Sequence, residues 1–210
     1  MAESIFITGT DTGVGKTHVL CELLRTLRSS GTNTVGFKPV ECGRDRSDSR
    51  AILSVCEGTG ITLEDINPVY FETPVAPQAA AEIEGPKWEL DSVLEAFDDL
   101  KSRFDAVIVE GAGGWLVPIE SGFSVADLAG SLQLPVVVVA ANRLGVLNHT
   151  LLTVNQIERD GLDCRTVILN DLADGEPDES TASNEAVLRD QLDCPLLRFQ
   201  FSQSGLDLFG

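Results

Sequence analysis

Short apolar runs and helical patterns alternate along most of this chain. Five runs are apolar without polar alternation and predict buried strands: Ile5–Thr8, Thr34–Phe37, Ala106–Val109, Val136–Ala140 and Thr166–Leu169. Apolar residues recur at helical spacing in six segments: Thr17–Ser29, Ser47–Cys56, Glu89–Arg103, Val125–Ser131, His149–Arg159 and Asn184–Leu192. Strands that are apolar on both faces and separated by helices are typical of a parallel sheet covered on both sides. We therefore predict an α/β fold with one doubly wound parallel sheet, in a single domain over residues 1–210.

Two segments give a less regular pattern. Residues 171–183 combine a glycine, a proline and several acidic side chains, which predicts a solvated loop. Residues 78–85 are compatible with a helix, but the pattern there is ambiguous.

The segment Gly9–Thr17 is rich in glycine and lies between the first predicted strand and the first predicted helix. In that position, backbone N–H groups face the phosphates of a nucleotide, a lysine neutralises charge and a threonine hydroxyl contacts Mg²⁺. Lys16 and Thr17 supply these two side chains. The usual loop has four residues before its Gly-Lys-Thr sequence, whereas five separate Gly9 from Gly15 here. The segment therefore predicts a nucleoside triphosphate site whose loop is one residue longer than the usual one.

Three more polar residues stand where ligands of such sheets bind, beyond the carboxyl ends of the strands. Lys38 follows the second strand, and Pro39 directs it toward the crevice; alone, it favours a solvated lysine at a strand end. Asp48 begins a predicted helix, where it fits a helix cap as well as a Mg²⁺ ligand; alone, it favours the cap. Glu110 ends the third strand and is followed by small residues, which is typical of a Mg²⁺-binding carboxylate beside a close ligand.

The last two strands are also followed by candidate binding residues. Gly145 precedes a helix N-terminus, which can bind a carboxylate or a phosphate. His149 fits a general base, but a capping or packed histidine is the favoured interpretation. Asn170 offers an amide that can read a nucleobase edge, or it forms an ordinary turn.

The composition narrows the possible partners. A formal net charge of −18 disfavours binding to nucleic acid or to anionic membranes. No apolar run is long enough to span a bilayer and the first residues lack a basic patch, so we expect a cytoplasmic protein. Only four lysines occur, and an acid-rich, lysine-poor surface suits a cytoplasm of high salt; a halophilic source is our hypothesis. The five cysteines have neither disulfide nor zinc-site spacing, which predicts free and mostly buried thiols, with Cys42 as the exception.

Together these segments resemble the dethiobiotin synthetases. The resemblance rests on Thr8-Gly9-Thr10-Asp11-Thr12-x-Val14-Gly15-Lys16-Thr17, Lys38-Pro39-Val40, Asp48, Val109-Glu110-Gly111-Ala112-Gly113-Gly114-Trp115, Leu144-Gly145-x-x-Asn148-His149 and Asn170-Asp171. The segments occur in the order that the family has, and the five-residue spacing of the phosphate loop is the family's own form.

The resemblance implies a fold of the phosphate-loop type, ATP and Mg²⁺ as cofactors, and a homodimer with its substrate site at the subunit interface. The catalytic residues would then be Lys16, Lys38 and Thr12. ATP would contact Gly13, Val14, Gly15, Lys16, Thr17, Asn170 and Glu110. Mg²⁺ would lie among Thr17, Asp48 and Glu110. The substrates, 7,8-diaminononanoate and CO₂ or bicarbonate, would contact Lys38, Cys42, Gly145, Val146, Leu147 and Asn148, the last four from the partner chain.

Three departures from the family are visible. Gly13 stands where some members carry a glutamate, and Cys42 stands where a serine contacts the substrate in a well-known member. Because a thiol is a weak hydrogen-bond donor, we expect altered substrate affinity. Residues 197–201 lack the familiar Gly-x-Ile-Pro form, which leaves the nucleotide preference open.

Two other functions remain as alternatives. A ligase of the cobyrinate amide synthase type shares a related phosphate loop, but the chain has no room for a glutaminase domain. A partitioning or metal-carrier ATPase usually carries a second lysine early in the loop, where this chain has Thr12, Gly13 and Val14.

Overall fold

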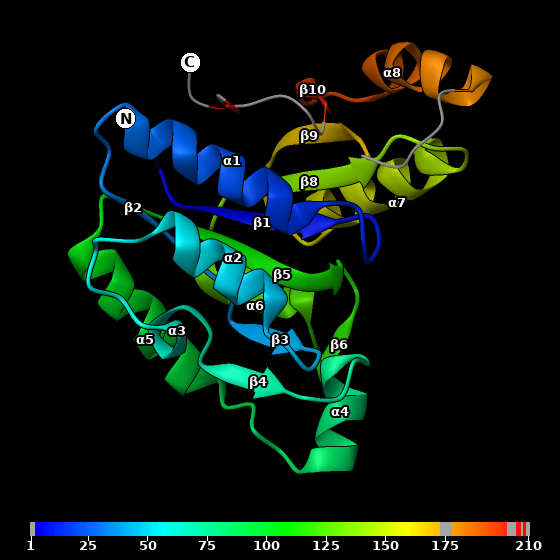
Figure 1. Ribbon diagram of the computed structural model, residues 1–210. Helices are drawn as coiled ribbons and strands as arrows, with labels where there is room; N and C mark the ends of the chain where they lie inside the picture. Colours follow the sequence, from blue (N-terminus) through cyan, green and yellow to red (C-terminus); the bar gives the residue numbers. More distant parts are fainter. Residues whose placement is uncertain (1–2, 173–177, 201–204, 207, 209–210) are drawn as a thin grey trace.

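The computed structural model describes residues 3–172, 178–200, 205, 206 and 208. Its centre is a six-stranded parallel sheet with the strand order β10-β9-β8-β1-β5-β2 (Figure 1). The strands of this sheet are β1 (Ile5–Gly9), β2 (Thr34–Phe37), β5 (Ala106–Gly114), β8 (Val136–Ala141), β9 (Cys164–Asp171) and β10 (Leu196–Gln200). The parallel α/β sheet predicted from the apolar runs is thereby confirmed.

Helices cover both faces of the sheet. Figure 1 shows α1 and α2 in front of it and α6 and α7 behind it. The helices are α1 (Lys16–Ser29), α2 (Ser47–Val55), α3 (Leu63–Ile66), α4 (Pro77–Glu84), α5 (Leu90–Arg103), α6 (Val125–Leu132), α7 (Val146–Arg159) and α8 (Glu179–Gln191). The ambiguous segment at residues 78–85 is thus largely helical, with a proline at its start, where the missing N–H costs nothing.

Two helix boundaries were predicted wrongly. α7 begins at Val146, three residues before His149, because Gly145 adopts the left-handed conformation at its N-cap. α8 begins at Glu179, so residues 179–183 are helical rather than part of a loop. The Asp178 side chain accepts the Thr181 N–H at 2.9 Å and starts that helix. Residues 173–177 of the predicted loop lie outside the described residues.

Several strands escaped prediction. β10 pairs with β9 at the edge of the sheet, and its exposed arginine and glutamine interrupt the apolar pattern. Two small sheets join β3 (Val40–Cys42) to β4 (Val69–Phe71) and β6 (Pro118–Glu120) to β7 (Phe123–Ser124). Strands of two or three residues are too short to show a period, so only their pairing reveals them.

The core is continuous between the sheet and its helices. The central strands β1 and β8 are buried over their whole length. Cys21, Cys56 and Cys164 are buried free thiols, as expected, while Cys42 and Cys194 are half-buried. None of the helices in the described ranges is long and apolar enough to cross a membrane.

Parallel pairing places the candidate site at one edge of the sheet. In the register of β1 with β5, Ile7 lies beside Glu110, and in that of β2 with β5, Phe37 lies beside Val109. The phosphate loop after β1, Lys38 after β2 and Glu110 in β5 therefore meet at the carboxyl ends of three neighbouring strands.

Candidate active site

A cavity of about 650 Å³ opens at this edge of the sheet. Six parts of the chain form its wall: the phosphate loop, the β2–β3 connection with β3, the start of α2, residues 74–77, the end of β5 and Val117. Among the predicted site residues, the cavity is lined by Thr12, Gly13, Gly15, Lys16, Thr17, Lys38, Cys42, Asp48 and Glu110. The fold thus brings together most of the residues that the sequence singled out.

The phosphate loop requires glycine at position 15. Gly15 is the N-cap of α1 and has a φ of 92°, a backbone conformation that residues with a Cβ rarely adopt. A Cβ on Gly15 would also stand 2.2 Å from Nδ2 of Asn170. That Nδ2 donates to the Val14 carbonyl at 2.9 Å, so Asn170 supports the loop from β9 of the same sheet. Val14 is buried in the core and, like Asn170, does not line the cavity.

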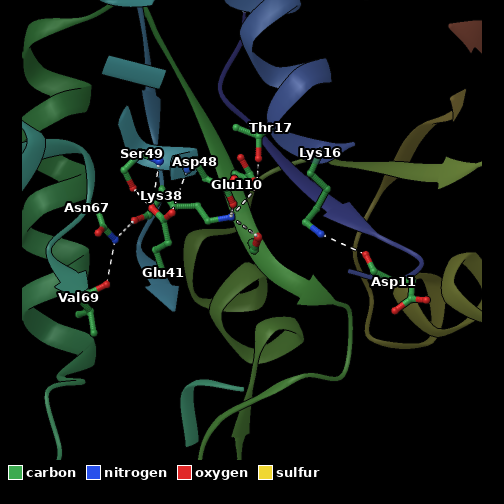
Figure 2. A network of polar contacts seen from close by, with 11 residues as sticks. Asp11, Lys16, Thr17, Lys38, Glu41, Asp48, Ser49, Asn67, Val69 and Glu110 are labelled. Atoms are coloured by element: carbon green, nitrogen blue, oxygen red, sulfur yellow. Dashed lines mark hydrogen bonds and ion pairs between the residues drawn. The ribbon is translucent and has the colours of Figure 1, made fainter. Parts of the chain in front are cut away.

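Lys38 lies between two carboxylates in the floor of the cavity (Figure 2). Its Nζ is 2.5 Å from Oε1 of Glu110 and 3.1 Å from Oδ2 of Asp48. It also donates to the Gly111 carbonyl at 3.3 Å. The Thr17 hydroxyl donates to the same Glu110 oxygen at 3.0 Å, which joins the start of α1 to this cluster.

The electrostatics of this cluster are those of a buried, coupled set of charges. Burial alone would lower the pKa of Lys38, but Glu110 and Asp48 outweigh it and raise that pKa above its ordinary value. Burial raises the pKa of Glu110, and Lys38 opposes that shift. For Asp48, burial raises the pKa, yet the contact with Lys38 reverses the sign and lowers it. Lys38 therefore stays protonated and supplies a fixed positive charge.

Lys16 has a different environment from Lys38. Its Nζ donates to the Asp11 carbonyl at 3.2 Å within the loop, and Figure 2 shows the side chain directed toward Asp11. Burial, followed by the positive charge of Lys38, lowers the pKa of Lys16 to about 8. A negatively charged ligand in the loop would restore the protonated form, because opposite charge favours it.

Asp48 is not the cap of α2, which corrects the interpretation favoured from that residue alone. The N-cap is Arg46, with a φ of 46° and no side-chain cap hydrogen bond, and Asp48 is the second residue of the helix. Its carboxylate turns toward Lys38 instead. The cap is supplied by Glu41, which accepts the N–H groups of Asp48 and Ser49 at 2.9 and 3.0 Å.

The segment predicted to bind the substrate carboxylate lies apart from the cavity. Gly145, Val146, Leu147 and Asn148 form the start of α7 and are absent from the cavity wall. His149 is exposed and likewise outside this wall, which contradicts its interpretation as a packed residue. Arg143, just before the segment, pairs with Asp11 of the phosphate loop at 3.2 Å.

Sequence reasoning missed three parts of the wall: Glu41, the segment Pro74–Pro77 and Val117. Glu41 was passed over because an acid between a lysine and a cysteine carries no spacing signal. The segment Pro74–Pro77 was passed over too, although its two prolines mark a turn that leads into α4. Cys42 does line the cavity, and burial raises the pKa of its thiol to about 11, so it remains protonated.

The residues present fit a Mg²⁺ ion. Oε2 of Glu110 is buried and has no hydrogen-bond partner among the described residues. The described ranges contain no group of three or more His, Cys, Asp or Glu side chains arranged for a metal. One or two carboxylates, with phosphate oxygens completing the shell, are what Mg²⁺ commonly takes from a protein. Glu110, Asp48 and the Thr17 hydroxyl are such a donor set.

Solved structures with a similar fold are nucleotide-binding proteins. A plasmid partition protein from Borrelia burgdorferi bound to AMPPNP has a TM-score of 0.58 at 14% identity, covering 99% of this chain and 92% of that one. The septum site-determining protein MinD from Pyrococcus horikoshii, complexed with Mg-ADP, has a TM-score of 0.57 at 18% identity, covering 93% and 79%. At such identities the likeness establishes the phosphate-loop fold alone.

Sequence comparison is more specific. Residues 3–197 match the family described as an AAA domain. The ATP-dependent dethiobiotin synthetase BioD of Akkermansia muciniphila is 41% identical over 92% of this chain and 90% of its own length. The enzyme of the same name from Anaeromyxobacter dehalogenans is 47% identical over 79% and 75%, and that of Methanocaldococcus jannaschii is 41% identical over 81% and 80%. The chain belongs to the family of ATP-dependent dethiobiotin synthetases.

Proposed function

We propose that this protein uses ATP and Mg²⁺ to carboxylate 7,8-diaminononanoate with CO₂ and to close its ureido ring, which yields dethiobiotin, ADP and phosphate. One observation carries the proposal: Lys38, held by Glu110 and Asp48, lines the same cavity as Lys16 of the phosphate loop. Two buried lysines beside a triphosphate site suit a reaction in which negative charge moves between oxygens. The names of the relatives, ATP-dependent dethiobiotin synthetases, support ATP as cofactor and dethiobiotin as product.

The proposed chemistry has three steps. One amine of the substrate attacks CO₂ and releases a proton, which gives a carbamate. A carbamate oxygen then attacks the γ-phosphorus while the bond to ADP breaks, forming a carbamic–phosphoric anhydride. The second amine attacks the carbamoyl carbon and phosphate leaves, which closes the ring. None of these steps needs a nucleophile from the protein, so the enzyme contributes charge and position.

The charged and polar residues of the cavity, other than Glu41, have roles in this proposal. Lys16 and the backbone N–H groups of residues 13–17 bind the phosphates, and Thr12 borders the transferred group. Lys38 faces the carbamate and the phosphoryl group, where its fixed charge stabilises the developing anion. Glu110, Asp48 and Thr17 would hold Mg²⁺, which when bound neutralises charge on phosphate oxygens. Asn170, fixed against the Val14 carbonyl, would read the nucleobase with its remaining oxygen, which is buried and has no hydrogen-bond partner among the described residues.

We further propose a homodimer in which Gly145–Asn148 of one chain bind the substrate carboxylate in the cavity of the other. Two observations support this arrangement. The segment is the N-terminus of a 14-residue helix, where free N–H groups favour an anion, and it does not line the cavity of its own chain. Leu144 beside it is 82% exposed, an apolar surface that a partner would cover. The strongly acidic chain is proposed to work in the cytoplasm as one catalytic domain.

One experiment tests the function directly. The protein is incubated with ATP, Mg²⁺, bicarbonate and 7,8-diaminononanoate, and the mixture is examined by mass spectrometry for dethiobiotin. We expect product that requires all four components and carries label from ¹³C-bicarbonate. Absence of product in both low-salt and high-salt buffer would refute the proposal.

A further inference from the structure

Glu41 is a buried acid that the proposed chemistry does not use. It is the central residue of β3, between Val40 and Cys42, and its side chain is only 5% exposed in the cavity wall. Within the described residues, no lysine, arginine or histidine forms an ion pair with it. A buried carboxylate without compensation is costly, so its partners must come from elsewhere.

The partners of Glu41 are the first turn of α2. Oε1 accepts the N–H of Asp48 at 2.9 Å, and Oε2 accepts the N–H of Ser49 at 3.0 Å and also the Ser49 hydroxyl. Free N–H groups and the positive end of a helix favour a negative charge at this place. Arg46 stands at the N-cap position, but its guanidinium has only donors and cannot accept these N–H groups; it donates to Asn67 at 3.0 Å instead.

The contact between Glu41 and the first turn of α2 fixes Asp48, the residue that faces Lys38. The N–H of Asp48 is held by Glu41, while the carboxylate of the same residue lies 3.1 Å from Lys38 Nζ. The Asp48 side chain is 38% exposed, so little packing holds it in place. Figure 2 shows Glu41 in one cluster with Lys38, Asp48 and Ser49.

We propose that Glu41 is a positioning residue: it anchors the first turn of α2 so that Asp48 is held toward Lys38 and toward the place of the metal ion. The inference rests on the proposed function only for the identity of the metal; the anchoring itself is independent of the substrate. Residues that hold a metal ligand in this way commonly affect metal affinity by about 10–100-fold.

The test compares Glu41→Ala and Glu41→Gln with wild type and with a matched control. Asp127→Ala removes a cap from α6, whose capping box joins Ser124 and Asp127, and it leaves the cavity intact. Two readouts are used: hydrogen exchange of residues 47–50 in the protein without ligand, and Mn²⁺ binding in the presence of ADP, followed by electron paramagnetic resonance.

We expect Glu41→Ala to accelerate exchange of residues 47–50 and to weaken Mn²⁺ binding by about 10–100-fold. Glu41→Gln, which keeps one acceptor oxygen and folds in the same space, should lie between Ala and wild type. Asp127→Ala should lower Tm without changing Mn²⁺ binding.

Wild-type Mn²⁺ affinity in both Glu41 variants, or an equal loss in Asp127→Ala, would overturn the inference. If Glu41→Ala does not fold, Glu41→Gln alone decides it, because an unchanged affinity there contradicts the anchoring role. Failure of wild type to make dethiobiotin would refute the proposed function and leave this result standing, since neither readout involves the diamine.

Discussion

Nζ of Lys38 lies 2.5 Å from Oε1 of Glu110, although 72 residues separate them in the chain. The same oxygen accepts the Thr17 hydroxyl, so one carboxylate atom joins the phosphate loop to the lysine after β2. Both side chains of the ion pair are almost fully buried. In a buried ion pair each charge compensates the other, so removal of one member leaves an uncompensated buried charge. The contact therefore ties Lys38 and the phosphate loop into one unit.

The first prediction concerns Lys38. Replacing it in Lys38→Ala should lower kcat by about 10²–10³-fold, the range found when one preorganised donor to a developing oxyanion is removed. Turnover is measured by dethiobiotin formation, and circular dichroism checks the fold. Lys101→Ala provides the control, because Lys101 lies over Phe97 on α5, away from the cavity. Turnover within twofold of wild type would remove Lys38 from the mechanism.

The second prediction is a pH dependence of nucleotide binding. The pKa of Lys16 is lowered to about 8 in the free protein, mainly by burial. A bound triphosphate favours the protonated form, so above pH 8 binding must take up a proton. Affinity for a non-hydrolysable ATP analogue should be constant below about pH 7 and should weaken by up to about tenfold per pH unit above pH 8.

Binding of a fluorescent analogue between pH 6.5 and 9.5 measures this profile. In Lys16→Arg the guanidinium stays protonated, so the fall in affinity above pH 8 should vanish even if the overall affinity is lower. A flat wild-type profile up to pH 9.5 would contradict the lowered pKa.

The third prediction separates backbone strain from collision in the phosphate loop. Gly13 and Gly15 both have positive φ, but only a Cβ on Gly15 would strike Asn170. Gly13→Ala should lose about 1–2 kcal/mol of stability from strain alone. Gly15→Ala should lose a further 1–3 kcal/mol, roughly the cost of overpacking, and should bind nucleotide more weakly.

Urea unfolding of both variants measures the difference. Adding Asn170→Gly to Gly15→Ala removes the obstructing amide, and the double variant should recover part of the loss. Equal stabilities of the Gly13 and Gly15 variants would show that the Asn170 contact is unimportant.

The fourth prediction follows from the net charge of −18. Repulsion among acidic side chains destabilises the compact state, and 1 M salt shortens its range to about 3 Å. The Tm should therefore rise as KCl increases from 0.05 to 1 M. Choline chloride at equal ionic strength is the control: it screens charge as KCl does, but it cannot replace K⁺ at a specific binding site. A Tm that stays constant or falls would count against a salt-adapted surface.

The sequence by itself determined the class of fold and most of the site. Apolar runs without alternation indicate strands buried on both faces, and such strands require a parallel sheet. The phosphate loop and Glu110 were recognisable because glycines or an acid directly follow buried strands. Lys38 and Asp48 were ambiguous alone, since a solvated lysine and a helix cap fit their positions as well. Their order along the chain was enough to indicate the family.

Only the tertiary structure decided how these residues meet. Sequence spacing could not reveal that Asp48 faces Lys38 while Glu41 caps α2. Asp48 stands at the start of the helix, where a cap is expected, whereas Glu41 belongs to β3 and reaches the helix only in the folded chain. Nor could it reveal β10, whose mixed side chains become a strand through pairing with β9. The local pattern of apolar and polar residues indicates which face of a helix or strand is buried. Long-range hydrogen bonds and ion pairs depend instead on which helices and strands the fold places side by side.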